Sequence, residues 1–338
     1  MRRIWAFTLT LLLAGCAAEE PEVVVEEEES TVTIRSVGDI LVHSDVYTAA
    51  RTDTGFDFSR MFEPVSEYMQ GADITTANME VPVAGEEFGL SGYPQFNAPP
   101  EIIDALKNSG VDIVNNATNH SMDRGGEGVI ASTGNMRDRE MLYAGSFSSA
   151  ADAATPRIIE ANGITVGFLG FTYGTNGLPV EEEHFASLID DNLTYQITTL
   201  DSQVDVTVVM LHMGDEYAPL QNEFQEETAA AALEAGADLV LGGHPHVVEP
   251  FDGPVWTPTA TSCTASGMSR PRWAGSASSR LPSAATRCRL PARGSCPPTP
   301  SARRSATTTT CSPSSRLATT WTFKNGWRTY GSASTWRW

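Results

Sequence analysis

The stretch "FQEETAAAALEAGADLVLGGHPH", residues 224–246, contains a helix pattern, a strand pattern and two histidines in succession. Residues 224–237 are rich in alanine, the residue that most favours a helix. Residues 238–246 continue with an apolar run and end in Gly-Gly-His-Pro-His. The preceding run "VDVTVVMLHMG" (204–214) is apolar at nearly every position, which predicts a strand buried on both faces. A helix between two buried strands is typical of a parallel α/β sheet.

The same alternation extends towards the N-terminus. Strand patterns occupy residues 31–39, 72–80 and 111–120, and helix patterns occupy residues 58–71, 99–110 and 126–140. Residues 157–171 form two apolar runs around Asn162-Gly163, a strong hairpin signal. We therefore expect one α/β domain over residues 31–252, built around a largely buried sheet with one hairpin insertion.

Polar side chains cluster just after five of the strand patterns, in "VGDILVH", "ANMEVP", "NNATNHSMDRG", "LHMGDEY" and "GGHPH". Five of the six histidines lie there, and only His184 lies elsewhere. Open α/β sheets bind their ligands beyond the carboxyl ends of the strands. The candidate metal ligands are Asp39, His43, Glu80, Asn119, His212, His244 and His246. Asn78, Asn116 and Glu216 lie beside them in sequence and are candidates to support them.

Imidazole, carboxylate and amide groups together suit Mn, Zn, Fe or Mg, and the domain has no cysteine for a thiolate site. In an extended His-X-His segment the two rings point the same way, so we expect His244 and His246 to face one centre. Gly242 and Gly243 let the backbone approach a ligand closely. Seven candidates exceed the needs of one ion, which favours two ions that share a carboxylate.

The N-terminus reads as an export signal. "MRRIWAFTLTLLLAGC" (1–16) has two arginines and a short apolar stretch, which is too short for a membrane span. Its Leu-Ala-Gly-Cys ending resembles a bacterial lipobox, with Cys16 as the lipidation site; an ordinary signal peptide with a chance cysteine is the alternative. Residues 17–30 are acidic and predict a solvated tether. We therefore expect a lipid-anchored protein at the cell surface or in the periplasm.

Charge is divided sharply along the chain. Residues 1–252 hold all 42 Asp and Glu and 10 of the 22 Lys and Arg, a formal net charge of −32. Such acidity would repel nucleic acid. Residues 253–338 contain no Asp, Glu or His, but hold four of the five Cys and six of the seven Trp. Disorder accounts poorly for this composition. Our hypothesis is that this tail is out of frame, so that C-terminal strands of the domain are lost or scrambled, and we assign it no fold.

Taken together, "SVGDILVH", "ANMEVPV", "NNATNHSMDRGGEGV", "LHMGDEY" and "LGGHPHVVEP" resemble the CapA family of capsule and poly-γ-glutamate synthesis proteins, which is related to calcineurin-like metallophosphoesterases. The match covers residues 31–252, in family order. It implies a four-layer α/β/β/α sandwich with divalent metal ions, in which Glu80 bridges two of them. By the same resemblance the ligands are Asp39, Glu80, Asn119, His212, His244 and His246. His120, with Asp123 nearby, would be the catalytic pair that protonates the leaving group.

The chain departs from the phosphoesterase pattern at two places. His43 lies four residues past Asp39, where the pattern has Asp-X-His, and Asn78-Met79-Glu80 replaces a second Gly-Asp. Both departures bear on whether two metals are held equally well.

Three functions remain open. The first is a surface-anchored component of capsule or poly-γ-glutamate synthesis or export; the resemblance implies membrane subunits of the synthase as partners and an anionic polymer or phosphoester as substrate. The second is a metal-dependent envelope hydrolase without a capsule role. The third is a non-catalytic metal-binding scaffold, against which the lack of cysteine counts.

Overall fold

The computed structural model describes residues 30–250, 255–256, 306–309 and 319–324. The predicted signal peptide, Cys16 and residues 17–29 of the tether lie outside these residues, and so does most of the tail. In the described part, no helix combines the length and the apolar character needed to cross a membrane.

Two sheets form the centre of the molecule. The first has the strand order β10-β11-β1-β2-β3-β4 and the second β5-β6-β7-β8-β9. The strands of the first sheet, in chain order, are β1 (Thr31–Asp39), β2 (Ile74–Asn78), β3 (Ile113–Asn115), β4 (Leu142–Ala144), β10 (Ala306–Thr309) and β11 (Thr319–Lys324). Those of the second are β5 (Arg157–Ala161), β6 (Ile164–Thr172), β7 (Val206–His212), β8 (Leu239–Gly243) and β9 (Val255–Trp256). β1 to β4 are parallel to one another, and so are β6 to β9.

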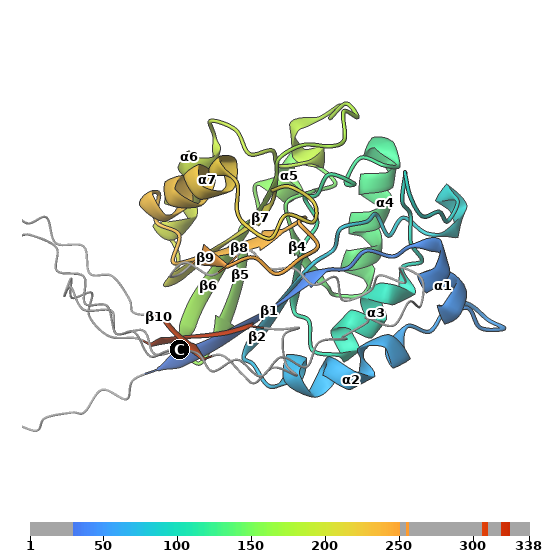
Figure 1. The fold of residues 1–338 in the computed structure, drawn as a ribbon, viewed down its shortest axis with the longest axis horizontal. Helices are drawn as coiled ribbons and strands as arrows, with labels where there is room; N and C mark the ends of the chain where they lie inside the picture. Colours follow the sequence, from blue (N-terminus) through green and yellow to red (C-terminus); the bar gives the residue numbers. More distant parts are fainter. Residues whose placement is uncertain (1–29, 251–254, 257–305, 310–318, 325–338) are drawn as a thin grey trace, which may run out of the picture.

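Helices cover the outer faces of both sheets, and Figure 1 shows α6 and α7 well apart from α2, α3 and α4. The longer helices are α2 (Ser59–Gln70), α3 (Glu101–Asn108), α4 (Gly125–Asp138), α6 (Leu193–Asp201) and α7 (Glu223–Glu234). Shorter ones are α1 (Ser44–Ala50), α5 (Ala150–Ala153) and the 3₁₀ turns η1 (Glu86–Phe88) and η2 (Glu183–Phe185).

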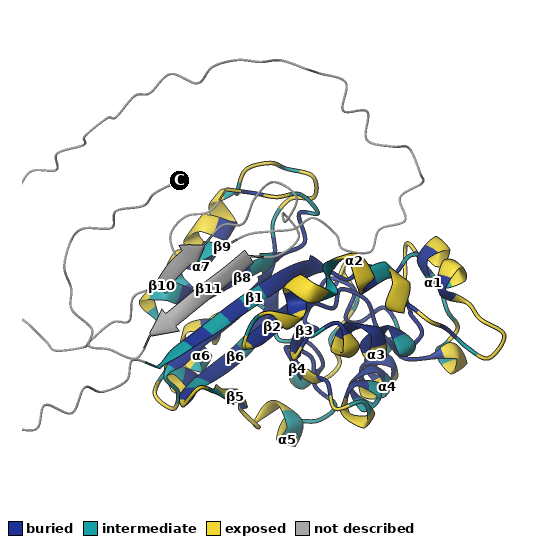
Figure 2. Cartoon of the chain, turned by 90° about the horizontal axis from the view of Figure 1, so that it is seen from below, coloured by how far each residue is buried: buried dark blue, intermediate teal, exposed yellow. Residues whose placement is uncertain are grey.

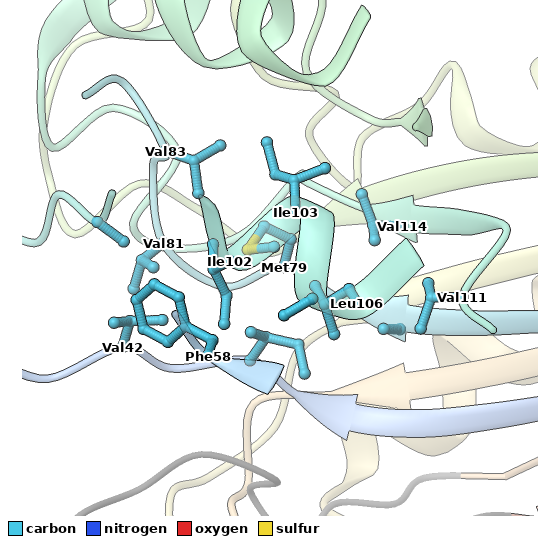
Figure 3. Packing of buried hydrophobic residues seen from close by; sticks show 14 of the residues in the cluster. Val42, Phe58, Met79, Val81, Val83, Ile102, Ile103, Leu106, Val111 and Val114 are labelled. Carbon is cyan, nitrogen blue, oxygen red and sulfur yellow. The ribbon is translucent and has the colours of Figure 1, made fainter. Parts of the chain in front are cut away.

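Three apolar clusters separate the layers. One lies between the first sheet and its helices, where Ile102, Ile103 and Leu106 of α3 lie among Met79 and other buried side chains (Figure 3). A second joins the inner faces of the two sheets, and a third joins the second sheet to α6 and α7. The structure is thus the four-layer α/β/β/α sandwich of metallophosphoesterase-like proteins.

Strand β7 shows why the sequence folds into layers. Val208 and Met210 pack into the cluster between the sheets, whereas Val209 and Leu211 pack against the helices. Every residue of the strand is buried, as its continuous apolar run predicts. β1 instead alternates between half-buried and buried residues before its last turn towards the site (Figure 2).

The predicted secondary structure is largely confirmed. The expected helices at 58–71, 99–110 and 126–140 are α2, α3 and α4, and the helix at 224–237 is α7. The hairpin is β5–β6, where Asn162 and Gly163 both have positive φ, the geometry of a type I′ turn.

The tail requires a correction. We assigned no fold to residues 253–338, but three short segments of it are strands: β9 lies beside β8, and β10 and β11 extend the first sheet beyond β1. Their sequences, "VW", "ATTT" and "TTWTFK", are rich in the β-branched and aromatic residues that favour strands. The frame hypothesis is a separate question and stays a prediction.

Candidate metal centre

The candidate ligands meet at one edge of the sandwich. Asp39, Asn78 and His212 are the last residues of β1, β2 and β7, and His244 directly follows β8. Because parallel strands end at the same edge, the side chains at those ends converge. The contacts join the two sheets, since Asp39 and Asn78 belong to the first and His212 and His244 to the second.

Asn78 is the link between the sheets. Its Nδ2 donates to Asp39 Oδ1 at 2.7 Å and lies 2.8 Å from Nδ1 of His212. Its Oδ1 accepts from Asn115 Nδ2 at 2.7 Å. A carboxylate only accepts, so the amide nitrogen must face Asp39. His212 Nδ1 is then an acceptor, and its proton is on Nε2, which donates to Asn119 Oδ1 at 2.8 Å.

Asp39 is fully buried and holds the loop after β8. Its carboxylate accepts from the backbone N–H of His244 at 3.2 Å, and its Oδ2 lies 2.9 Å from Nδ1 of His246. The two ring centroids of His244 and His246 are 6.0 Å apart. Both histidines therefore lie beside the same carboxylate, as we expected.

The backbone of this loop differs from our expectation. We predicted an extended His-X-His segment, but His244 and His246 have φ values of 99° and 57°. β8 ends at Gly243, and the chain then turns so that the amide of His244 and the ring of His246 both reach Asp39. Non-glycine residues in this region cost on the order of 1–3 kcal/mol each, strain that proteins retain mainly at functional sites.

In the described part of the chain, two groups of side chains could hold a metal ion: Glu80 with His212 and His244, and Asp39 with Glu80 and His246. Glu80 belongs to both. Its Oε1 lies 3.6 Å from His246 Nε2 and 4.0 Å from His212 Nε2. These separations are too long for hydrogen bonds. They suit atoms that share a cation, because ligands about 2.1 Å from a metal lie roughly 3.4 Å apart.

Two buried atoms of these groups, Glu80 Oε2 and His244 Nδ1, have no hydrogen-bond partner. Buried polar atoms are satisfied in the great majority of cases, so each exception needs a reason. Both belong to residues that could hold a metal, and both can donate a lone pair to a cation. The donor set of nitrogen and oxygen atoms fits a divalent metal such as Zn or Mn.

Electrostatics favour a cation at the same place. Burial, with Asp39, Glu216 and Asp123 nearby, raises the pKa of Glu80 well above its usual value. Burial and the neighbouring histidines lower the pKa of His212 well below its usual value, and burial lowers that of His244. The metal-free site therefore disfavours both the carboxylate charge and the imidazolium charge. A divalent cation stabilises the carboxylate and binds neutral imidazole, so it relieves both.

His120 and Asp123 form a separate pair next to this centre. His120 Nδ1 lies 2.7 Å from Asp123 Oδ2, which also accepts from the backbone N–H of Phe96 at 2.6 Å. The carboxylate fixes the proton of His120 on Nδ1, since it can only accept. Phe96 packs edge-on against His120, with ring centroids 4.7 Å apart, and against His43 on its other side at 5.0 Å.

The structure does not bring every predicted residue into the two groups. His43 precedes α1, is only half-buried and packs on Phe96. Asn116 binds the backbone of Ser146 through both atoms of its amide. Glu216 is exposed and acts on Glu80 and His244 through its charge. Asn115, which we did not predict, supports Asn78 directly.

A sandwich of two sheets with histidines, carboxylates and an amide at the carboxyl ends of its strands defines a metallophosphoesterase-like protein with a candidate metal centre. Within that class, the chain belongs to the family of bacterial capsule synthesis proteins, PGA_cap, whose family model matches residues 33–255.

Two relatives carry related names. The chain is 29% identical over 258 residues to the capsule biosynthesis protein CapA of Bacillus anthracis, covering 72% of this chain and 62% of that protein. It is 28% identical over 263 residues to the PGA biosynthesis protein CapA of Bacillus subtilis strain 168, covering 74% of this chain and 66% of that protein. The match thus spans less than two thirds of either relative. The crystal structure of a hypothetical protein from Thermus thermophilus aligns with a TM-score of 0.41 at 15% identity, over 67% of this chain and 75% of its own, which carries no structural argument.

Proposed function

We propose that this protein is a metal-dependent phosphoesterase-type hydrolase that acts in the synthesis or export of a capsular polymer such as poly-γ-glutamate. The observation that carries the proposal is the pair of overlapping side-chain groups that share buried Glu80. The relatives' printed names supply the capsule role.

Two divalent cations held by Asp39, Glu80, Asn119, His212, His244 and His246 would activate a water molecule and neutralise phosphoryl charge. The protein's own groups orient this centre and move the proton. Asn78 fixes Asp39 and His212 relative to each other. His120 gives its proton to the leaving oxygen, and Asp123 stabilises its protonated form.

We further propose a lipid anchor at Cys16, placement at the cell surface or in the periplasm, and membrane subunits of a polymer synthase as partners. The lipobox-like sequence and the acidic tether support the anchor. The family supports the partners.

Metal analysis and turnover of the purified full-length protein test this function. We expect close to two equivalents of a divalent metal after dialysis against Mn²⁺ or Zn²⁺, and hydrolysis of p-nitrophenyl phosphate that chelation abolishes. Metal binding without turnover of mono- or diesters would favour a scaffold instead. A protein that binds no metal would overturn the proposal.

Asp123→Asn should slow the reaction without emptying the metal centre. Asparagine keeps the shape of Asp123 but loses the charge that stabilises protonated His120, so proton transfer weakens by up to about 100-fold. Phenyl phosphate needs this proton more than p-nitrophenyl phosphate, whose leaving group is a weaker base. The kcat for phenyl phosphate should therefore fall more. Equal losses for both substrates would contradict the role of His120.

A further inference from the structure

Two exposed tyrosines flank the metal centre. Tyr173 follows β6 and is 43% exposed, and its ring centroid lies 4.9 Å from that of His244. Tyr217 lies in the loop after β7 and is 70% exposed, and its ring lies 5.8 Å from His246. Each candidate metal group contains one of these histidines. Each group therefore has one solvent-facing aromatic ring beside it.

The backbone fixes both rings in place. The N–H of Tyr173 donates to the carbonyl of His212 at 3.0 Å, and the N–H of Tyr217 donates to that of Pro245 at 2.7 Å. Tyr217 has a φ of 63°, the left-handed region that a bulky residue seldom occupies. The loop thus holds a large apolar side chain in water at a backbone cost, which folding alone does not explain.

The surroundings of the rings are acidic. Asp215 and Glu216 are exposed on the same loop as Tyr217, and Glu216 raises the pKa values of both tyrosines, after burial. Both phenols therefore stay protonated and neutral near pH 7. The charges that shift the pKa values of the site's groups come from carboxylates and histidines, with no Lys or Arg among them in the described residues.

The basic side chains nearest in sequence are engaged elsewhere. The guanidinium of Arg124 donates to the carbonyls of Asp123, Gly89 and Gln95 and to Ser91. Arg157 is bound to Asp152 and to the backbone around it. A polyanionic chain lying across the rim would meet carboxylates without a compensating cation, which is repulsive.

We infer that Tyr173 and Tyr217 bind an uncharged sugar ring that carries the reacting phosphoryl group, so that the substrate class is a sugar phosphate rather than a polyglutamate strand. This inference rests on the proposed function for the phosphoryl group alone. The apolar C–H face of a pyranose packs on an aromatic face. Its several hydroxyl groups can donate to Glu216 and Asp215, whereas a nucleobase offers fewer donors.

The kinetic test compares two monoesters of equal charge, glucose 6-phosphate and glycerol 3-phosphate. We expect the wild-type protein to prefer the sugar, and Tyr173→Leu and Tyr217→Leu each to reduce the ratio of kcat/KM values about fivefold. Tyr217→Phe should retain the preference, since the ring provides the contact. Tyr195→Leu is the matched control, because Tyr195 is 72% exposed on α6.

The second measurement needs no turnover. Saturation-transfer NMR on the metal-free full-length protein should show contacts to the ring protons of methyl glucoside, which the Tyr173→Leu/Tyr217→Leu double variant loses and Tyr195→Leu keeps. Sugar contacts without hydrolysis would refute the proposed function but leave the sugar-binding rim. Stronger contacts from a γ-glutamyl tripeptide or from adenosine monophosphate, or unchanged sugar preference in both leucine variants, would overturn the inference.

Discussion

Glu80→Gln is expected to empty both metal positions of the site. Glu80 belongs to both candidate groups, so a single neutral amide weakens each of them. Changing groups that merely support metal ligands already lowers affinity about 10–100-fold. For this shared carboxylate we expect at least about a 100-fold loss of metal affinity, and loss of phosphoesterase turnover with it. Metal content after dialysis measures the effect.

Glu216→Gln is the matched control, because it removes the same charge from the exposed mouth of the site. It should keep its metal. If Glu80→Gln retained two equivalents of metal, Glu80 would not be a shared ligand, and the arrangement of two overlapping groups would be wrong.

The metal-free form of Glu80→Gln should be more stable than the metal-free wild type. The folded protein raises the pKa of Glu80 above 4.5, so it binds the proton of Glu80 more tightly than the unfolded chain does. The free energy of unfolding then falls as pH rises from about 4.5 towards the raised pKa. Glutamine lacks this penalty. Melting in EDTA should show a difference between the two proteins that grows with pH in this window, and that reverses when metal is added.

The sequence could predict which strand ends carry the site, but not how each side chain is turned. "NNATNH" contains three asparagines, and the pattern does not distinguish Asn115 from Asn116. The position of the end of β3 decides. Asn115 is the last residue of the strand and faces Asn78, whereas Asn116 turns towards Ser146.

The loop after β8 shows the same limit. Spacing alone suggested an extended His-X-His, since alternate residues of an extended chain share a face. The buried carboxylate of Asp39, 205 residues away in sequence, accepts the amide of His244 and holds the loop in a left-handed turn. Contacts at that separation override local preference, and no local pattern encodes them.

Tyr173 and Tyr217 were not predicted because their sequence environment carries no signal. An exposed aromatic residue in a loop is ordinary. They become candidates only when the fold places their rings beside His244 and His246.

Gly243→Ala is expected to disrupt the centre from behind. A Cβ added at Gly243 would lie 2.7 Å from Asn78 Nδ2 and 3.0 Å from Asp39 Oδ1. Asn78 cannot move aside cheaply, because its amide is bound to Asp39 and Asn115 and faces His212. We expect a loss of roughly 1–3 kcal/mol in the free energy of unfolding. We also expect metal binding to weaken by about 10-fold or more, since it depends on the same contacts.

Gly134→Ala provides the comparison that makes this result interpretable. Gly134 lies within α4, and a Cβ there meets nothing within 4 Å. Alanine should leave metal content unchanged and stabilise the helix by up to about 1 kcal/mol. Urea unfolding and metal titration of both variants separate the two cases. If Gly243→Ala bound metal as tightly as Gly134→Ala, the contact of β8 with Asn78 and Asp39 would not position the ligands. The convergence of the two sheets would then have to depend on the side chains of His212 and His246 alone.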